Sequence, residues 1–205
     1  QLVYGASGLS TDATAITLPV TDVADLEAYE GMLVTIAQPL VVNNNYGLGR
    51  YGEVDLGTER LYQGTQVALP GDAANAVEAE NLKKQILIDD GSTKQNLDPI
   101  AYPGTGLDAY NTLRLGDTVN TITGVMGYSF DRYRIHPTVQ PEFTATNPRT
   151  DAPELHDDAD LRVASFNVLN YFNGDGQGAG FPTSRGADSE EEFTRQEAKL
   201  VSAIP

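Results

Sequence analysis

Three basic side chains, Arg132, Arg134 and His136, alternate along one predicted strand. Alternate residues of a strand point to the same face of a sheet, so these three are expected to share a face. Cations that track phosphates, and rings that stack on bases, are how β-domains bind single-stranded nucleic acid. The candidate nucleic-acid-binding residues are Arg50, Tyr51, Arg132, Tyr133, Arg134 and His136. The alternative is an exposed strand face balanced by neighbouring acids, with the tyrosines in the core or at a barrel rim.

Asn167 is the second candidate, because it interrupts an apolar run. Residues 160–172, DLRVASFNVLNYF, are rich in β-branched and aromatic types and predict a strand. An amide buried without a hydrogen bond costs about 1–3 kcal/mol, so Asn167 needs a partner. It either caps the turn after the strand or belongs to a functional site.

The composition excludes several classes of protein. With 29 acidic and 13 basic side chains, the net charge is −16, and repulsion from phosphates excludes a general basic coat on nucleic acid. A small local site is still compatible with this charge. The absence of cysteine removes disulfides, thiol catalysis and cysteine-bound metals, and two histidines leave little room for a histidine-rich metal site. No apolar stretch is long enough to span a bilayer.

The charge is unevenly spread and divides the chain. Residues 141–160 contain six acids, one base and three prolines, a composition that keeps a segment extended and solvated. We therefore expect an N-terminal segment over 1–25, a folded domain over 26–140, an acidic linker over 141–160 and the start of a second domain over 161–205.

The segment before the linker has the pattern of short strands separated by turns. Gly124 and Gly127 interrupt the longest of these strands, where glycine is typical of a bulge or a sharp bend. The predicted strands are 31–36, 51–56, 85–88, 117–130 and 132–136, with one helix over 71–81 that Asp72 would cap. The prediction is a mainly β fold, specifically a five-stranded OB-like Greek-key barrel.

Two runs in the C-terminal part carry a family resemblance. SFNVLNYF at 165–172 and GFPTSRGAD at 180–188 are followed by EFTRQ at 192–196 and by Lys199. Together they resemble the opening of the endonuclease/exonuclease/phosphatase superfamily, whose members are built like deoxyribonuclease I. The barrel segment is similar to the OB-like domain that precedes the catalytic domain in secreted bacterial nucleases of this kind.

This resemblance implies a secreted, metal-dependent phosphodiesterase that hydrolyses DNA, with RNA as a second candidate substrate. It further implies that Asn167 helps to organise Mg²⁺, or another divalent cation, and the scissile phosphate. Leu169 stands where many members have a polar residue. No membrane span and no obligate protein partner are expected.

The family's metal-binding glutamate and its catalytic histidine and aspartates come later in the sequence than Pro205. The resemblance therefore implies a fragment that ends early in the catalytic domain. Of the catalytic set it holds Asn167 alone, so we expect it to be inactive and to bind no metal tightly. A closing helix is predicted from the capping box of Ser189 and Glu192, with an apolar stripe at Phe193, Leu200 and Ile204.

Two alternatives stay open. One is a non-catalytic module that binds nucleic acid or carbohydrate, since OB-type barrels bind both. The other is a purely structural spacer domain, which the net negative charge of the barrel segment favours over polyanion binding.

Overall fold

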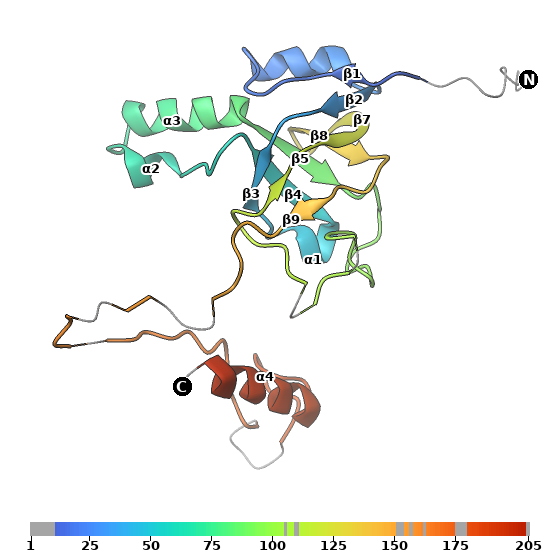
Figure 1. Cartoon of the computed structure of the whole chain (residues 1–205). Coiled ribbons are helices and arrows are strands. Elements are labelled where there is room, and N and C mark those ends of the chain that lie inside the picture. The colour runs from blue at the N-terminus through green and yellow to red at the C-terminus, as the bar shows by residue number, and fades with distance from the viewer. Residues whose placement is uncertain are drawn as a thin grey trace, which may run out of the picture. The chain divides into compact units, whose positions relative to one another are not determined.

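The computed structural model describes residues 11–104, 106–108, 111–150, 154–155, 158–161, 163–174 and 180–203. The chain divides into two compact units, Gln1–Asp151 and Ala152–Pro205, called the first and the second unit below. Figure 1 shows a sheet with short helices in the first unit and a single helix in the second. Among the described residues, no helix is long and apolar enough to cross a membrane.

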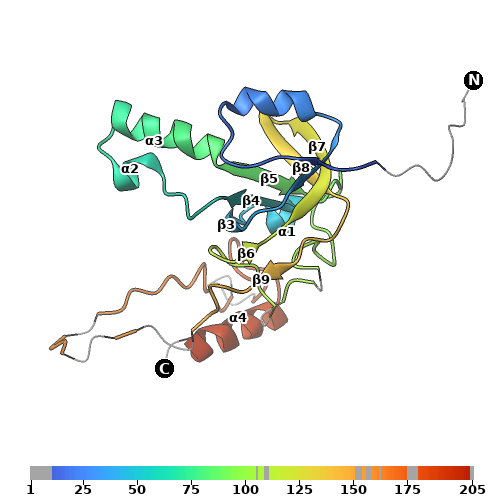
Figure 2. The ribbon, with the colours of Figure 1, turned by 45° about the horizontal axis from the view of Figure 1, so that its top comes forward.

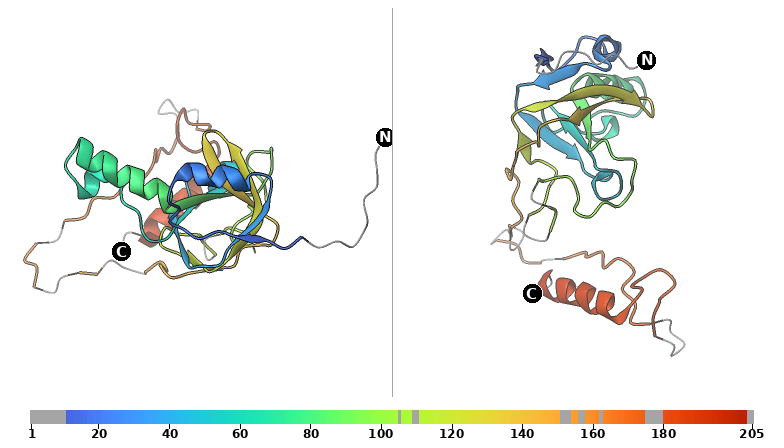
Figure 3. Two further views of the ribbon diagram at one scale, coloured as in Figure 1. Left: turned by 90° about the horizontal axis from the view of Figure 1, so that it is seen from above. Right: turned by 90° about the vertical axis from the view of Figure 1, so that its right-hand side faces the viewer.

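The first unit is built on one curled sheet (Figure 3). In the described part of this unit the sheet has nine strands, in the order β1-β2-β7-β8-β5-β4-β3-β6-β9. The strands are β1 (Thr14–Ala15), β2 (Leu33–Ile36), β3 (Leu40–Asn44), β4 (Glu53–Gly57), β5 (Gln85–Asp89), β6 (Thr118–Val119), β7 (Ile122–Ser129), β8 (Arg132–Pro137) and β9 (Phe143–Thr144). The pairs β1–β2 and β5–β8 are parallel, and the other pairs are antiparallel.

The mainly β fold is confirmed, but the sheet is larger than the predicted five strands. The run 117–130 forms two strands, β6 and β7, separated by Asn120 and Thr121. Strands β1, β6 and β9 contain two residues each, which is too short for an alternating pattern to be recognised.

The core of the first unit is a cluster of buried apolar side chains, many of them on alternate residues of the strands. Val34 and Ile36 of β2, and Val54 and Leu56 of β4, are fully or almost fully buried, as their spacing predicts. Asp55 of β4, on the opposite face of the strand from Val54 and Leu56, is also buried. Its carboxylate is covered by polar partners, the side chains of Asn44 and Arg132.

The first unit extends beyond both expected boundaries of the barrel. Ile16 and Leu18 belong to its core although they precede residue 26, and β1 pairs with β2 through Thr14 and Ala15. Phe143 of β9 packs against the same core from within the expected linker. Buried apolar surface, rather than the change in composition, therefore sets where this unit begins and ends.

The helices of the first unit are η1 (Val23–Tyr29), α1 (Leu48–Tyr51), α2 (Gly64–Val67) and α3 (Asp72–Lys83). Helix α3 confirms the predicted helix. Its N-cap is Gly71, which has no side chain, and the expected cap Asp72 is the first helical residue, where its charge complements the helix dipole. Figure 2 shows η1 and α3 near each other beside β5, β7 and β8. A hydrogen bond at 3.0 Å from the N–H of Val20, just before η1, to the carbonyl of Lys83, at the end of α3, links the two segments.

Glycine at position 124 is required by a close approach of two strands, and not by a bulge. The ladder between β7 and β8 is continuous from Gly124 opposite Pro137 to Ser129 opposite Arg132. A Cβ atom at Gly124 would lie 2.2 Å from the carbonyl oxygen of His136. This position therefore admits no side chain without a shift of backbone atoms.

The second unit contains α4 (Glu190–Ala203), which confirms the predicted closing helix. The Ser189 hydroxyl accepts the Glu192 N–H at 3.2 Å, as a cap should, while the Glu192 carboxylate accepts the Asp188 N–H at 2.9 Å. Phe193 of the apolar stripe contacts Tyr171, with ring centroids 4.9 Å apart, and Phe181, at 5.8 Å. Ile204 lies outside the described residues.

The strand predicted over 160–172 is not formed in the described part of that run. Leu169 and Asn170 have φ angles of 44° and 48°, which turn the chain out of an extended conformation. An extended segment needs a neighbouring strand for its backbone hydrogen bonds, and the described residues of the second unit include none. Instead, the Gln196 side chain of α4 donates to the carbonyls of Val168 and Leu169.

Candidate functional site

The basic residues of β8 lie against carboxylates of the two strands next in the sheet. The Arg132 guanidinium bonds the Asp55 carboxylate of β4. Arg134 donates to Glu53 of β4 at 2.7 Å and to Asp89 of β5 at 2.5 Å. The cations are balanced by neighbouring acids, as the second interpretation of the sequence predicts, but Arg134 is buried and not exposed.

Arg134 is enclosed by its partners. It is 3 % exposed, and it also donates to the Ser129 carbonyl at 2.9 Å. Its guanidinium carbon lies 5.7 Å from the centroid of the Phe130 ring. A phosphate could reach this guanidinium only by displacing two carboxylates, so the geometry assigns Arg134 a structural role.

His136 stands at the end of the same cluster. Its Nδ1 is 3.5 Å from Asp89 and accepts or donates no hydrogen bond within the described structure. Burial raises the pKa of the neighbouring Asp90, and the charge of Asp89 adds to that rise, whereas the Ser92 N–H and His136 oppose it. Burial also raises the pKa of Tyr102 well above its usual range. The negative charges of Asp90 and Asp89 raise it further.

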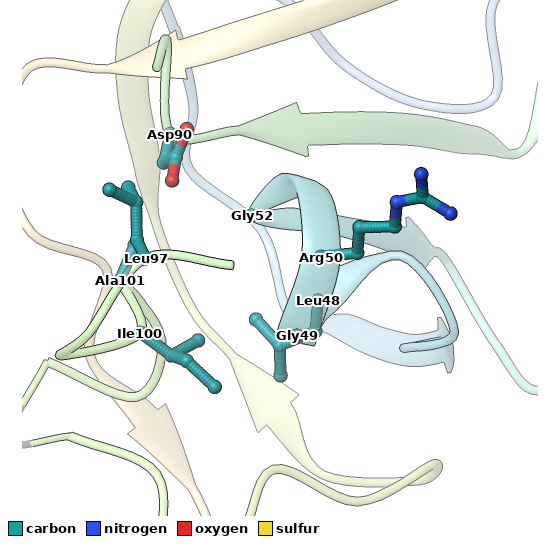
Figure 4. A pocket seen from close by; sticks show the side chains of 8 residues that line it. All are labelled: Leu48, Gly49, Arg50, Gly52, Asp90, Leu97, Ile100 and Ala101. Atoms are coloured by element: carbon teal, nitrogen blue, oxygen red, sulfur yellow. The ribbon is translucent and has the colours of Figure 1, made fainter. Parts of the chain in front are cut away.

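Arg50 and Tyr51 lie on the short helix α1 and not on a strand of the sheet. The Arg50 Nε donates to Gln95 at 2.9 Å, and its guanidinium carbon is 5.1 Å from the centroid of the Tyr51 ring. Figure 4 shows a crevice beside α1, and the Arg50 guanidinium points away from it. The crevice is too narrow to hold a water molecule. Among the described residues, no hydrogen bond, ion pair or ring contact joins either residue to β8. The contacts within the described residues therefore do not join Arg50 and Tyr51 to the β8 residues.

Tyr133 lies between the two arginines of β8 and contacts η1 and β7. Its hydroxyl donates to Glu27 of η1 at 2.9 Å, and its ring lies 4.7 Å from the ring of Tyr128 on β7. The pair lines a hollow of about 290 Å³ that the sequence did not indicate.

Asn167 is exposed in the second unit and caps a local turn. Its Oδ1 accepts the Leu169 N–H at 2.9 Å, which is the turn-capping interpretation of this amide. The bond uses the amide oxygen and leaves the amide nitrogen available to donate. Asn167 also lines a hollow of about 510 Å³ whose wall includes α4.

Three cations share that hollow with Asn167, namely Arg185, Arg195 and Lys199. One carboxylate lines it too, Glu192, whose oxygen is 3.9 Å from the Arg195 guanidinium. In a chain with a net charge of −16, a hollow lined by three cations and one acid is a local exception. The spacing of Arg195 and Lys199, four residues apart on a helix, is the sequence signal that would have found it.

The described residues around this hollow do not by themselves fit a divalent metal ion. Hard cations prefer several carboxylate or carbonyl oxygens, but Glu192 already accepts the Asp188 N–H and Asn167 already accepts the Leu169 N–H. Nowhere in the described part of the chain do three or more histidine, cysteine, aspartate or glutamate side chains gather as metal ligands would.

Comparison with known protein families gives a match to the first unit. A family model described as a domain of unknown function, DUF8508, matches residues 8–148. The chain belongs to this family. No curated protein and no solved structure matches the chain.

The matched segment corresponds closely to the first unit. It takes in β1 and β9, the two strands that lie outside the predicted barrel boundaries, and ends just before the division between the units at Asp151. The hollow around Asn167 lies outside the matched segment.

Proposed function

We propose that this chain is part of a secreted, metal-dependent nuclease that hydrolyses phosphodiester bonds of DNA, with RNA as a second substrate. In this proposal the first unit is an OB-like accessory domain and the second unit is the start of an endonuclease/exonuclease/phosphatase domain. The runs at 165–172 and 180–188 support it by their resemblance to that superfamily. The observation that carries it is the placement of Asn167 beside three cations in one hollow.

The chemistry of this hollow suits a phosphodiester. Guanidinium groups bind phosphate oxygens through paired, charge-assisted hydrogen bonds, which Arg185 and Arg195 can supply. The ammonium of Lys199 adds a point charge, and the free amide nitrogen of Asn167 adds a neutral donor. These residues would bind and orient the phosphate, and no step of hydrolysis is assigned to them.

Metal dependence belongs to the complete enzyme in this proposal. Because the described residues do not fit a divalent metal, this chain by itself is expected to be inactive and to bind Mg²⁺ or another divalent cation only weakly.

The test is a nuclease assay of the complete gene product, this 205-residue chain and two variants of the complete protein. We expect the complete protein to cleave plasmid DNA with Mg²⁺ and not with EDTA, and this chain to cleave nothing. Asn167→Ala is expected to lower the rate by about 10²-fold, as loss of one positioned donor does. Asn173→Ala, a change of the same kind outside the hollow, is expected to leave the rate unchanged.

Three outcomes would contradict the proposal. They are the absence of nuclease activity in the complete protein, activity in this chain alone, and equal rates for Asn167→Ala and Asn173→Ala. A parallel RNA substrate separates the two nucleic acids.

A further inference from the structure

A hollow of about 290 Å³ opens on the first unit between η1, the end of α3 and the β7–β8 hairpin. Figure 2 shows these elements around one region of the sheet. Its lining includes Leu26 from η1, Leu82 from α3, and the tyrosines Tyr128 and Tyr133 of the β7–β8 hairpin. The volume lies at the lower end of small-molecule sites, about 300 Å³, which suits one or two rings of a ligand.

One of the two tyrosines is fixed and the other is open to solvent. The hydroxyl of Tyr133 is held by Glu27, and its ring packs against Tyr128 with centroids 4.7 Å apart and planes tilted by 52°. Tyr128 is 45 % exposed and Leu82 is 53 % exposed. Large apolar side chains left uncovered around a hollow are a mark of a binding site.

The polar groups of the hollow have unused hydrogen-bonding capacity. Gln85 and Asp131 both line it, and neither side chain has a hydrogen-bond or ion-pair partner within the described residues. Arg132 uses one guanidinium nitrogen for Asp55 and keeps further donors free. An amide, a carboxylate and a guanidinium beside an open ring match a ligand that is apolar on its ring faces and carries hydroxyls at its edges.

The charge around the hollow argues against a polyanion. The positive charge of Arg132 is balanced by Asp55, while Asp131 has no cation partner in the described structure. Helix η1 adds Asp25 and Glu27 and contains no basic residue. The phosphates of a nucleic acid would be repelled here, whereas an uncharged ligand would not.

We propose that this hollow binds an uncharged oligosaccharide. The ring of Tyr128 stacks on the face of one sugar, and Gln85, Asp131 and Arg132 bond its hydroxyls. OB-type sheets provide such sites in other proteins, but the assignment here rests on these side chains and does not depend on the nuclease proposal.

The test is a titration of the ¹⁵N-labelled chain with four neutral probes: cellohexaose, maltohexaose, laminarihexaose and chitohexaose. We expect at least one of them to shift the amide resonances of β7, β8 and η1 with a Kd of about 1 mM or tighter. Tyr128→Ala is expected to weaken that binding about tenfold, which corresponds to about 1.4 kcal/mol, and Tyr128→Phe to preserve it. The control Tyr46→Ala removes a tyrosine that is 92 % exposed and outside the hollow, and it is expected to change nothing.

A twelve-residue oligothymidylate and a lysine-rich peptide are titrated in parallel. The proposal is overturned if none of the four sugars binds with a Kd below about 10 mM. It is also overturned if binding is indifferent to Tyr128→Ala while the fold is intact, or if the oligonucleotide or the peptide shifts the hollow's resonances instead. No cleavage is measured, so failure here is distinct from failure of the nuclease assay.

Discussion

Replacing Arg134 by methionine removes the centre of the polar cluster on β8 and keeps most of its aliphatic volume. The guanidinium donates to Glu53 at 2.7 Å, to Asp89 at 2.5 Å and to the Ser129 carbonyl at 2.9 Å. Methionine can form none of these bonds, so two carboxylates of β4 and β5 lose their cation.

The size of the loss follows from which partner can recover water. Glu53 is partly exposed and can be hydrated, whereas the Asp89 side chain is nearly enclosed. Removing one member of a buried ion pair costs about 3–5 kcal/mol, because the other charge is left uncompensated. With one of the two carboxylates able to hydrate, we expect Arg134→Met to lower the free energy of unfolding by about 3 kcal/mol, the lower end of that range.

The measurement is a urea titration followed by the amide resonances of β5 and β8, which report on the first unit. Arg149→Met, at an exposed position, is the matched control and is expected to change stability by less than about 0.5 kcal/mol. In an Asp89→Asn background the loss from Arg134→Met should shrink, since the uncompensated charge is gone. A loss below about 1 kcal/mol for the single variant would refute the assignment of Arg134 to a buried, charge-balancing role.

Two further predictions concern the same sheet. Gly124→Ala should cost about 1–3 kcal/mol in a urea titration, because its Cβ would meet the His136 carbonyl, while Gly49→Ala, whose Cβ meets nothing within 4 Å, should not destabilise. Burial raises the pKa of Asp90, so the folded state favours the protonated carboxyl. The stability that this protonated form contributes is complete below the unfolded-state pKa and is lost as pH rises through the folded-state pKa. Asp90→Asn, which keeps an acceptor for the Ser92 N–H, should therefore stabilise the protein at pH 7 and change little at pH 3; equal effects at both pH values would contradict this.

Features that depend on neighbours in the chain were predictable from the residues alone. Val34 and Ile36, two residues apart in the predicted strand 31–36, share the buried face of β2, and the Ser189 cap predicted the start of α4. These succeed because side-chain direction in a strand, and a bond between an N-cap and the third helical residue, involve only nearby residues.

A strand prediction fails where propensity is the only support. Residues 160–172 have a strong β-forming composition, yet their described part forms no strand and turns at Leu169 and Asn170. A strand is stabilised by hydrogen bonds and side-chain contacts with a neighbouring strand, and the residues of one strand do not show which segment will pair with it.

The chemistry of the β8 cations was decided by tertiary structure. The sequence alone determined that Arg132, Arg134 and His136 share one strand, and it left binding stripe and balanced face as alternatives. Arg132 meets Asp55 across 77 residues of sequence, and Arg134 meets Asp89 across 45. Only the order of strands in the sheet, with β5 between β4 and β8, brings these acids and bases together and neutralises them. The same folding brings Leu82 and Tyr128 into the lining of one hollow, which neither segment indicates by itself.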